Sequence, residues 1–585
     1  MKLIKILAVA LTLTLAACAQ QTAVAPDKAS AELSAVLAQY MERNARDNPF
    51  SALVSGEKPL AMPDMSYEGA KARAAFARTL LANVKRIDAD ALSHEEQLTL
   101  AMFERQLRLN VEGLDHYWLS FQATPYQAGL LVSNVPKLLG AFDLAVAQDR
   151  QDYTAFVGSI AALFDAYREQ LEQQQVRGIY LPKPAVPGTK GLYQGLVAPM
   201  PLMVTPADER LKGLSSAEKE QFKASVQQVL DTKLLPSLNS LIAVFNDDYI
   251  AAAPAQVGLS QYPGGAEAYR YLIKRETTMD LSPAEIHQRG LDYMATLRAE
   301  KAAIRKQLGF TGSEQAFKKK LLADERFYAK TPAEVEQRYQ RYMAMIEPKI
   351  DDYFSLKPKA PYGFKRLNPA AEATVTFGYY GAPSKKEPKG YYYYNGSKLN
   401  ERNMIWTQGL AYHETVPGHH FHLALQHENE ALPDFRKHGT FTTAFNEGWA
   451  NYAASLADEM GIMTDPYDRY GWLLFNSFIT ARLVVDTGMN ALGWSREQAM
   501  QYMAENTFES DVQIASETIR YSTSIPAQSL AYKLGLEKIW EIRRDMEQRL
   551  GDDFDIKKFH AAAVGSGALP LPLLEWHVQK MLLDN

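Results

Sequence analysis

Apolar residues recur at the three- and four-residue spacing of amphipathic helices over most of this chain. This spacing covers residues 31–175, 217–248, 282–308 and, with short interruptions, 403–583. Residues 176–215 are instead rich in proline and glycine and predict a long loop. The pattern therefore predicts a mainly α fold.

Strand-forming residues are concentrated just ahead of the last helical region. Residues 373–380 read ATVTFGYY and residues 390–395 read GYYYYN, which predicts a small antiparallel sheet. Tyr379 and Tyr380 can belong to a packed, half-exposed sheet face. They can also line an edge strand that pairs with an extended peptide, and the two interpretations are compatible. We therefore count both tyrosines as candidate substrate contacts.

Composition describes a globular protein with 47% hydrophobic and 22% charged residues. A net charge of −5 and the lack of a basic stripe argue against nucleic acid as a partner. We expect an N-terminal helical half over residues 31–350 and a catalytic half over 351–585, with a deep groove between them.

The first residues predict export and lipidation. Lys2 and Lys5 precede a short apolar run, and residues 15–18 read LAAC, which resembles a bacterial lipobox. Cys18 is the sole cysteine, and a lone structural cysteine is the alternative. We expect a signal peptide over residues 1–17, a lipid on Cys18, a tether over 18–30, and no transmembrane helix. Ala19 and Gln20 are typical of a lipoprotein in the outer membrane that faces the periplasm.

The segment that indicates chemistry is HETVPGHH, residues 413–420. Eleven histidines occur in the chain, and six lie close together: His413, His419, His420, His422, His427 and His438. Imidazole is a common zinc ligand, and Glu414 beside the first histidine is placed to act as general base on a water at the metal. The alternative for Glu414 is a salt-bridged surface residue.

This segment departs from the HExxH pattern, in which residues i and i+4 share one helix face. Its fifth position is Pro417, which cannot bind a metal. Proline has no N–H and glycine is permissive, so we expect a bulge at residues 416–418. Looping out two residues presents His419 as the second ligand, and looping out three presents His420. We favour His419 and keep both.

Glu447 is the candidate third ligand. Most glutamates on helices are solvated, but this one lies among Phe445, Trp449 and Tyr452, so we expect its face to be buried. A buried, unpaired carboxylate is costly, and a metal removes that cost. We interpret His422 as a residue that hydrogen-bonds a ligand, and Arg482 with Asp486 as a structural ion pair.

HETVPGHH, NEGWANY (446–452), RLVVDTG (482–488) and IRYSTSIPAQSLAYKLG (519–535) resemble a family of bacterial lipoproteins, domain of unknown function 885. That family is similar to thimet oligopeptidase, angiotensin-converting enzyme and carboxypeptidase Taq, which are helical zincins of the gluzincin type. The resemblance implies a zinc peptidase for short peptides. It implies that Tyr521 stabilises the oxyanion and that Arg520, Gln528 and Tyr532 bind substrate, although a core tyrosine with a buried arginine pair is the alternative.

The sequence thus favours a lipid-anchored zinc metallopeptidase, with Glu414 and Tyr521 as catalytic residues and a ligand set drawn from His413, His419, His420 and Glu447. Two other functions remain open. One is a non-catalytic peptide-binding lipoprotein with a degenerate metal site. The other is a metal-dependent hydrolase or oxidase that acts on non-peptide substrates.

Overall fold

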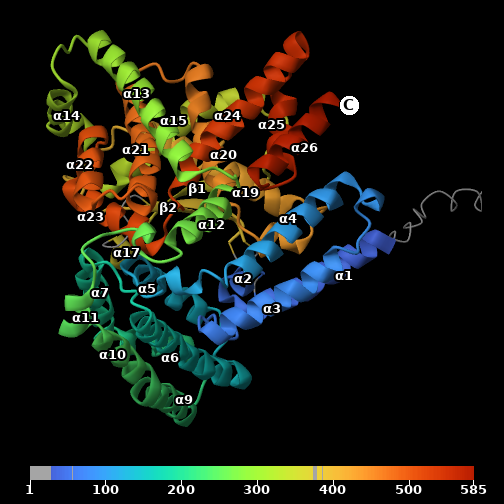
Figure 1. Ribbon diagram of the computed structural model, residues 1–585, viewed down its shortest axis with the longest axis vertical. Helices are drawn as coiled ribbons and strands as arrows, with labels where there is room; N and C mark the ends of the chain where they lie inside the picture. Colours follow the sequence, from blue (N-terminus) through green and yellow to red (C-terminus); the bar gives the residue numbers. More distant parts are fainter. Residues whose placement is uncertain (1–27, 56, 373–377, 385–386, 585) are drawn as a thin grey trace, which may run out of the picture.

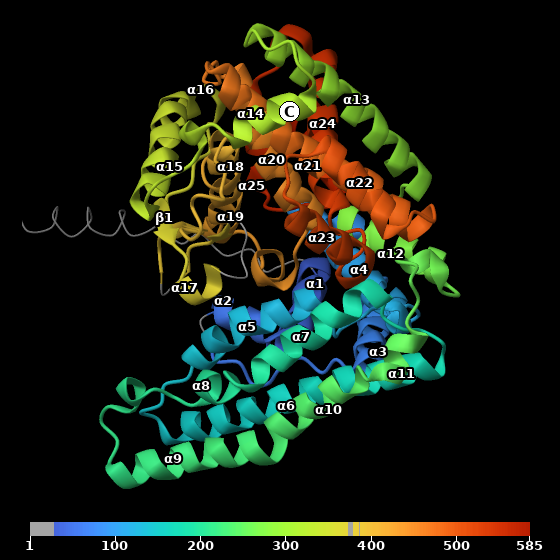
Figure 2. The ribbon, with the colours of Figure 1, turned by 90° about the vertical axis from the view of Figure 1, so that its left-hand side faces the viewer.

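The computed structural model describes residues 28–55, 57–372, 378–384 and 387–584 and consists mainly of α-helices (Figures 1 and 2). The mainly α prediction is confirmed. Cys18, the signal peptide and most of the tether lie outside the described residues. No described helix has the length and apolar character needed to cross a membrane.

The first part of the chain forms twelve helices among the described residues. They are α1 (Lys28–Asp47), α2 (Pro49–Ser55), α3 (Tyr67–Val84), α4 (His94–Glu112), α5 (Pro125–Gly140), α6 (Ala147–Val176), α7 (Val186–Val197), α8 (Met200–Val204), α9 (Ser216–Val229), α10 (Leu235–Val244), α11 (Asp247–Ala252) and α12 (Gly265–Thr277).

The predicted loop at residues 176–215 is wrong, because α7 and α8 occupy much of it. Pro187 and Pro201 lie in the first turns of these helices, where the missing N–H has no intrahelical partner to lose. Prolines that suggested a loop therefore begin helices instead.

The remainder of the chain carries the small sheet and the candidate site. Its elements are α13 (Pro283–Gln307), α14 (Glu314–Leu322), α15 (Pro332–Ile346), α16 (Ile350–Tyr353), β1 (Tyr362–Arg366), α17 (Pro369–Glu372), β2 (Gly378–Gly381), β3 (Gly390–Tyr394), α18 (Thr407–Glu414), α19 (His419–Glu428), α20 (Thr443–Glu459), α21 (Pro466–Ala491), α22 (Arg496–Asn506), α23 (Asp511–Ile519), α24 (Leu530–Leu550), α25 (Ile556–Gly565) and α26 (Leu571–Leu583).

The sheet is mixed rather than antiparallel, which corrects the prediction. Its order is β1-β3-β2. β2 pairs antiparallel with β3, with Tyr379 opposite Tyr393, but β1 pairs parallel with β3, with Tyr362 opposite Gly390. The sequence analysis found β2 and β3 and overlooked β1, whose run is short and bounded by proline. Residues 373–377 of the predicted strand lie outside the described residues.

Two large apolar cores organise the helices. One is built within residues 62–262. The other joins residues 29–107 and 297–354 with residues 392–578, so segments from both ends of the chain share one interior. The division of the chain near residue 350 stays a prediction.

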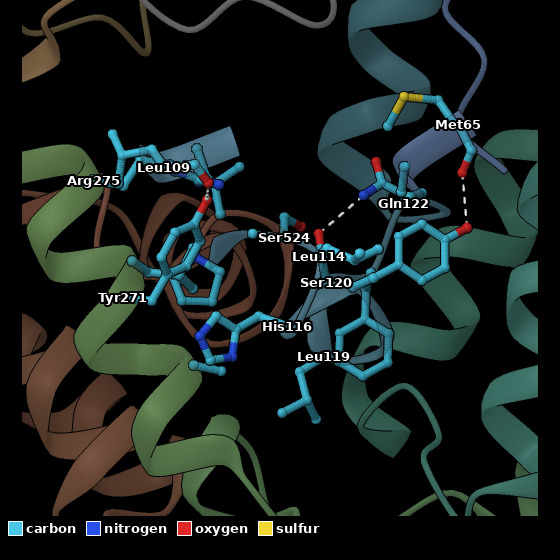
Figure 3. A pocket seen from close by; sticks show the side chains of 18 of the residues that line it. Met65, Leu109, Leu114, His116, Leu119, Ser120, Gln122, Tyr271, Arg275 and Ser524 are labelled. Atoms are coloured by element: carbon cyan, nitrogen blue, oxygen red, sulfur yellow. Dashed lines mark hydrogen bonds between the residues drawn. The ribbon is translucent and has the colours of Figure 1, made fainter. Parts of the chain in front are cut away.

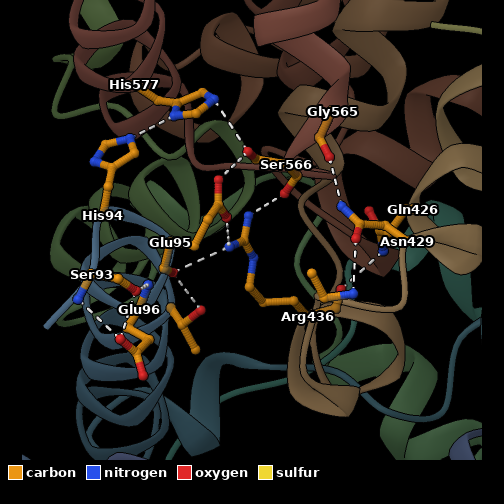
Figure 4. A network of polar contacts seen from close by, with 12 residues as sticks. Ser93, His94, Glu95, Glu96, Gln426, Asn429, Arg436, Gly565, Ser566 and His577 are labelled. Atoms are coloured by element: carbon orange, nitrogen blue, oxygen red, sulfur yellow. Dashed lines mark hydrogen bonds and ion pairs between the residues drawn. The ribbon is translucent and has the colours of Figure 1, made fainter. Parts of the chain in front are cut away.

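A polar network around the buried Arg436 and the half-exposed Glu95 connects α4 with the segment after α19 and with the end of α25 (Figure 4). The Arg436 guanidinium is almost fully buried and lies 2.7 Å from Glu95 Oε2. Glu95 Oε1 accepts a hydrogen bond from Ser566 Oγ at 2.5 Å, and His577 Nε2 lies 3.2 Å from the same hydroxyl. Burial raises the pKa of Glu95, but Ser566 and Arg436 outweigh it and hold that pKa below its usual value.

We predict that Glu95→Gln lowers the melting temperature by about 2–4 °C at neutral pH, because Arg436 loses its neutralising charge. Because the pKa of Glu95 is depressed, its contribution is present above the usual glutamate pKa of about 4.3 and is lost as the pH falls below it. The difference from wild type should therefore shrink in acid. Differential scanning calorimetry across pH measures it.

Glu104→Gln is the matched control, because Glu104 is on the same helix and pairs with the exposed Arg108. An exposed pair contributes little, so this variant should melt near the wild-type temperature. Equal destabilisation by the two variants would contradict a special role for the network around Arg436.

Candidate metal centre

The helix that carries HETVPGHH is broken where the sequence predicted a bulge. α18 ends at Glu414 and α19 begins at His419. The Val416–Pro417 peptide bond is cis. The Pro417 carbonyl accepts a hydrogen bond from Trp449 Nε1 at 3.0 Å, so the buried ring of α20 holds the connecting segment in place.

Gly418 makes this break possible because the chain turns back onto α18. Its N–H donates to the Tyr412 carbonyl at 3.0 Å. A Cβ at this position would lie 2.0 Å from the His413 carbonyl oxygen, closer than any side chain tolerates. Only glycine allows α19 to start this close to the end of α18.

The break brings His413, His419 and Glu447 into one cluster, and their ligand atoms all lie within 4.8 Å of one another. Glu447 Oε2 is 3.5 Å from His413 Nε2 and 3.5 Å from His419 Nε2. The neighbours Phe445, Trp449 and Tyr452 are fully buried, and the Glu447 side chain beside them is 16% exposed.

Within the cluster, the Glu447 carboxylate interacts with the imidazole rings of His413 and His419. Burial raises the pKa of Glu447, but hydrogen bonds from His413 and His419 outweigh it and hold that pKa far below its usual range. Burial lowers the pKa of His419, yet the Glu447 partner raises it above its ordinary value overall. The carboxylate is therefore kept ionised, as a metal ligand must be.

The outward ring nitrogens are oriented by other side chains. His413 Nδ1 lies 3.1 Å from Asn451 Oδ1, and the Asn451 amide donates to the Glu447 carbonyl at 2.8 Å. The amide oxygen can only accept, so His413 Nδ1 donates. His413 Nε2 faces Glu447, and loss of the proton that it shares with this carboxylate would give it a lone pair for a metal. His419 Nδ1 lies 3.3 Å from His422 Nε2, which confirms that His422 hydrogen-bonds a candidate ligand.

These distances fit a zinc ion. Two ligand atoms that are each about 2.1 Å from one tetrahedral ion lie about 3.4 Å apart, close to the 3.5 Å that separates Glu447 Oε2 from each imidazole nitrogen. Catalytic zinc sites typically have three protein ligands, and the Nδ1 atoms of their histidine ligands form hydrogen bonds with neighbouring groups. The residues present therefore fit a divalent metal of the zinc type.

The cluster contains His419 and not His420, the two histidines that the sequence left open. Its Nε2 lies 3.0 Å from the Ala360 carbonyl, and its Nδ1 lies 2.8 Å from the Tyr380 hydroxyl. Both ring nitrogens of His420 therefore form hydrogen bonds with groups in or next to the sheet. Burial lowers the pKa of His420 to about 4, so it stays neutral.

Glu414 lies at the end of α18, beside the cluster and beside the edge strand. Burial raises its pKa above the ordinary glutamate value, although His413 and His419 lower it. A backbone hydrogen bond from Tyr380 in β2 also contacts this carboxylate. A carboxylate with a raised pKa next to a metal cluster is suited to accept and return a proton.

α20 and α24 cross so closely that a Cβ on Gly448 would lie 2.5 Å from the Gly535 backbone. Tyr532 lies three residues before Gly535 on α24, and the charge of Glu447 on α20 acts on its hydroxyl. Burial, then the Glu447 charge, raises the pKa of Tyr532 to about 12. Tyr532 is half-buried, and the Arg482 guanidinium lies 4.6 Å from the centre of its ring.

Tyr521 lies elsewhere, in the core, and this corrects its expected role. The residue is fully buried, and its hydroxyl donates to Glu517 Oε2 and accepts from Arg482 Nε. The single hydroxyl proton of Tyr521 is therefore used in the hydrogen bond to Glu517 and is not available to stabilise an oxyanion. The core-tyrosine alternative describes it.

The expected Arg482–Asp486 ion pair is also wrong. Arg482 Nη2 lies 3.5 Å from Glu517 Oε2 instead. Asp486 accepts hydrogen bonds from Tyr269, Ser529 and the Ala527 backbone. Arg482 and Asp486, four residues apart on α21, therefore interact with different partners.

Arg520 and Gln528 lie together near Tyr532. Arg520 Nη2 donates to Gln528 Oε1 at 2.7 Å, and Gln528 hydrogen-bonds Tyr532. The remaining predicted contact, Tyr379, lies on β2 with its ring 38% exposed. Asn451 is the residue that sequence reasoning missed, although its i, i+4 spacing from Glu447 was a visible signal.

A family model described as "Bacterial protein of unknown function (DUF885)" matches residues 49–578. The chain belongs to this family. No curated protein matches it. The kinship with thimet oligopeptidase, angiotensin-converting enzyme and carboxypeptidase Taq stays a prediction.

Two solved structures share the fold of this DUF885 chain. A protein described as a lipoprotein, from Colwellia psychrerythraea, has a TM-score of 0.83 at 23% identity, over 95% of this chain and 100% of that one. A lipoprotein of unknown function from Shewanella oneidensis has a TM-score of 0.72 at 18% identity, over 94% and 99%. Metallocarboxypeptidase 1 of Trypanosoma cruzi reaches a TM-score of only 0.33 at 11% identity, over 95% of this chain and 100% of that one.

We predict that His419→Ala and Glu447→Ala each reduce bound zinc to a small fraction of the wild-type content, because each removes one of three clustered donors. His420→Ala is the matched control, a change of the neighbouring histidine that leaves the cluster intact. Zinc per chain is measured by mass spectrometry of the purified, dialysed proteins. Loss of zinc in His420→Ala with retention in His419→Ala would reverse the assignment.

Proposed function

We propose that this DUF885 chain is a zinc-dependent peptidase that hydrolyses short peptides. The observation that carries the proposal is the cluster of His413, His419 and Glu447 with the Glu414 carboxylate beside it. A binding protein needs neither three converging ligands nor an adjacent base with a raised pKa, whereas hydrolysis needs both.

A zinc ion held by these residues would polarise a carbonyl and make a water molecule acidic near neutral pH. The Glu414 carboxylate beside the cluster would take the proton from that water and deliver it to the leaving amine. The Tyr532 hydroxyl, on which the Glu447 charge acts, would donate a hydrogen bond to the carbonyl oxygen as it gains negative charge. Tyr532 takes the role that the sequence assigned to Tyr521.

The edge strand β2 supports a peptide as substrate. It pairs with β3 on one side only among the described residues, and its backbone contacts Glu414. An extended peptide can add to such an edge through main-chain hydrogen bonds and lie across the cluster. Tyr379 and Tyr380 flank that path, and Arg520 with Gln528 supplies donors near Tyr532.

We also infer that the protein is anchored to the outer membrane through a lipid on Cys18 and faces the periplasm. The two structural relatives described as lipoproteins support the anchor. The supporting evidence for the compartment is the lipobox and the residues that follow it.

Glu414→Gln keeps the size and hydrogen-bonding capacity of the side chain but cannot accept a proton. We expect kcat to fall at least about 100-fold while zinc content stays at the wild-type level. Tyr532→Phe should lower kcat by about 100- to 1000-fold with little change in ground-state peptide binding. Digests of mixed short peptides read by mass spectrometry give both values.

Tyr521→Phe is the matched control for the second variant. It should affect stability more than the chemical step, because Tyr521 belongs to the core. Undiminished cleavage by Glu414→Gln would refute the mechanism. If the zinc-loaded wild type cleaves no peptide, a binding protein or a hydrolase of non-peptide substrates becomes the better assignment.

Cys18→Ser should release the protein from the membrane fraction, because Cys18 is the sole thiol. Fractionation of cells that express both forms, with mass spectrometry of the wild-type N-terminus, checks this. A wild-type protein without an acyl chain would exclude the anchor. The Ala19→Ser variant is a control that leaves the lipidated residue in place.

A further inference from the structure

The helix α5 turns one side away from the apolar core. Its packed side belongs to the core within residues 62–262 and includes Ala128, Val135, Leu138 and Leu139. At 100° per residue, Tyr126, Leu130 and Lys137 point within about 40° of one another on the opposite side. All three are exposed, Tyr126 by 37% and Leu130 by 41%. We call these three residues the outer stripe of α5.

The first end of the outer stripe is connected with the candidate metal centre through Arg520. The Arg520 guanidinium lies 5.6 Å from the centre of the Tyr126 ring. Arg520 donates to Gln528, and Gln528 hydrogen-bonds Tyr532. The charge of Glu447 acts on the Tyr532 hydroxyl. A series of direct neighbours therefore leads from Tyr126 to a residue of the cluster.

The other end of the outer stripe contacts the sheet beside Glu414. The Lys137 ammonium lies 5.2 Å from the centre of the Tyr379 ring in β2. The backbone of the next residue, Tyr380, hydrogen-bonds the Glu414 carboxylate. Figures 1 and 2 show α5 next to α17, the short helix that precedes β2. The outer stripe therefore extends from the Tyr532 side of the candidate metal centre to its Glu414 side.

Lys137 is a cation without a carboxylate partner. Within the described residues, no carboxylate forms an ion pair with it, and partial burial is the sole cause that shifts its pKa, downward. Arg520, at the other end of the stripe, is instead paired with Glu517 at 3.3 Å. The uncompensated positive charge of this region thus lies at the β2 end, where an anionic group of a bound peptide would stabilise it.

The length of the outer stripe matches a short peptide. Tyr126 and Lys137 are separated by about 16 Å along the helix axis, which an extended peptide of about five residues covers. Because the cluster lies between the two ends, a group that reaches Lys137 is about two or three residues from the scissile bond. Leu130, exposed between the ends, offers an apolar contact to the side chain in between.

We infer that Lys137 is a specificity-determining residue whose ammonium binds a carboxylate of the peptide, about two or three residues from the scissile bond. This inference rests on the proposed peptidase function and specifies its substrate class as short peptides with an acidic group that reaches β2. The carboxylate is either an aspartate or glutamate side chain or the C-terminal carboxylate. Both have the same chemistry, and the experiment distinguishes them.

The cavity of about 410 Å³ in Figure 3 is separate from this site. Gln127 of α5 lines it, but neither the outer stripe nor the cluster does. Within the cavity, the rings of His116 and Tyr271 have their centres 4.9 Å apart. A substitution of His116 therefore serves as a control for the substitution of Lys137.

The test uses N-acetylated alanine hexapeptides that carry glutamate or glutamine at each position in turn, with a free or an amidated C-terminus. Binding is measured by calorimetry on the full chain with Glu414→Gln, supplied with zinc, so that no peptide is consumed. The kcat/KM values are measured with Glu414 in place. Because Lys137 is exposed, we expect glutamate at one position, or a free C-terminus, to bind about 5-fold tighter than its neutral counterpart. This ratio should shrink as salt is added.

Lys137→Met removes the charge and should bring the ratio close to one, whereas Lys137→Arg should preserve it. Lys137→Glu should reverse the preference, so that lysine in the peptide binds tighter than glutamine at the same position. A merely structural role of Lys137 would not produce this reversal. Two controls should keep the wild-type ratio: Lys233→Met, which removes an exposed charge between α9 and α10, and His116→Gln in the cavity.

The outcomes separate the two proposals. Acid-selective binding that is lost in Lys137→Met supports the inference even if no peptide is cleaved, in which case the peptidase proposal alone fails. Cleavage with equal binding of acidic and neutral peptides overturns the inference and leaves the peptidase intact. Acid selectivity that persists in Lys137→Met, or that is lost in His116→Gln instead, also overturns it.

Discussion

The site depends on one buried carboxylate, Glu447, which lies between two imidazoles and is shielded from water by the aromatic side chains around it. An ionised carboxylate in such surroundings costs several kcal/mol unless cations or donors compensate it. His413 and His419 provide that compensation at 3.5 Å each. The helix break, the tight turn at Gly418 and the support from Asn451 all serve to bring these two rings to one oxygen.

The close packing of α20 against α24 also determines which side chains lie near Glu447. Gly448 and Gly535 let two backbones touch. A larger side chain at either glycine would separate the helices and change the surroundings of Tyr532, whose pKa the Glu447 charge raises. Helix packing therefore decides which side chains of α24 face α20.

Local chemistry made much of this protein predictable from its sequence. The helical period, the break at Pro417 and Gly418, the histidine and glutamate donors and the burial of Glu447 all follow from residue types at short spacing. The parallel pairing of β1, the helices begun by Pro187 and Pro201, and the placement of His419, but not His420, in the cluster required the tertiary structure. So did the partners of Arg482 and of Tyr521. These depend on which distant segments pack together, because a hydroxyl or guanidinium acquires its role only from the neighbour that the fold places against it.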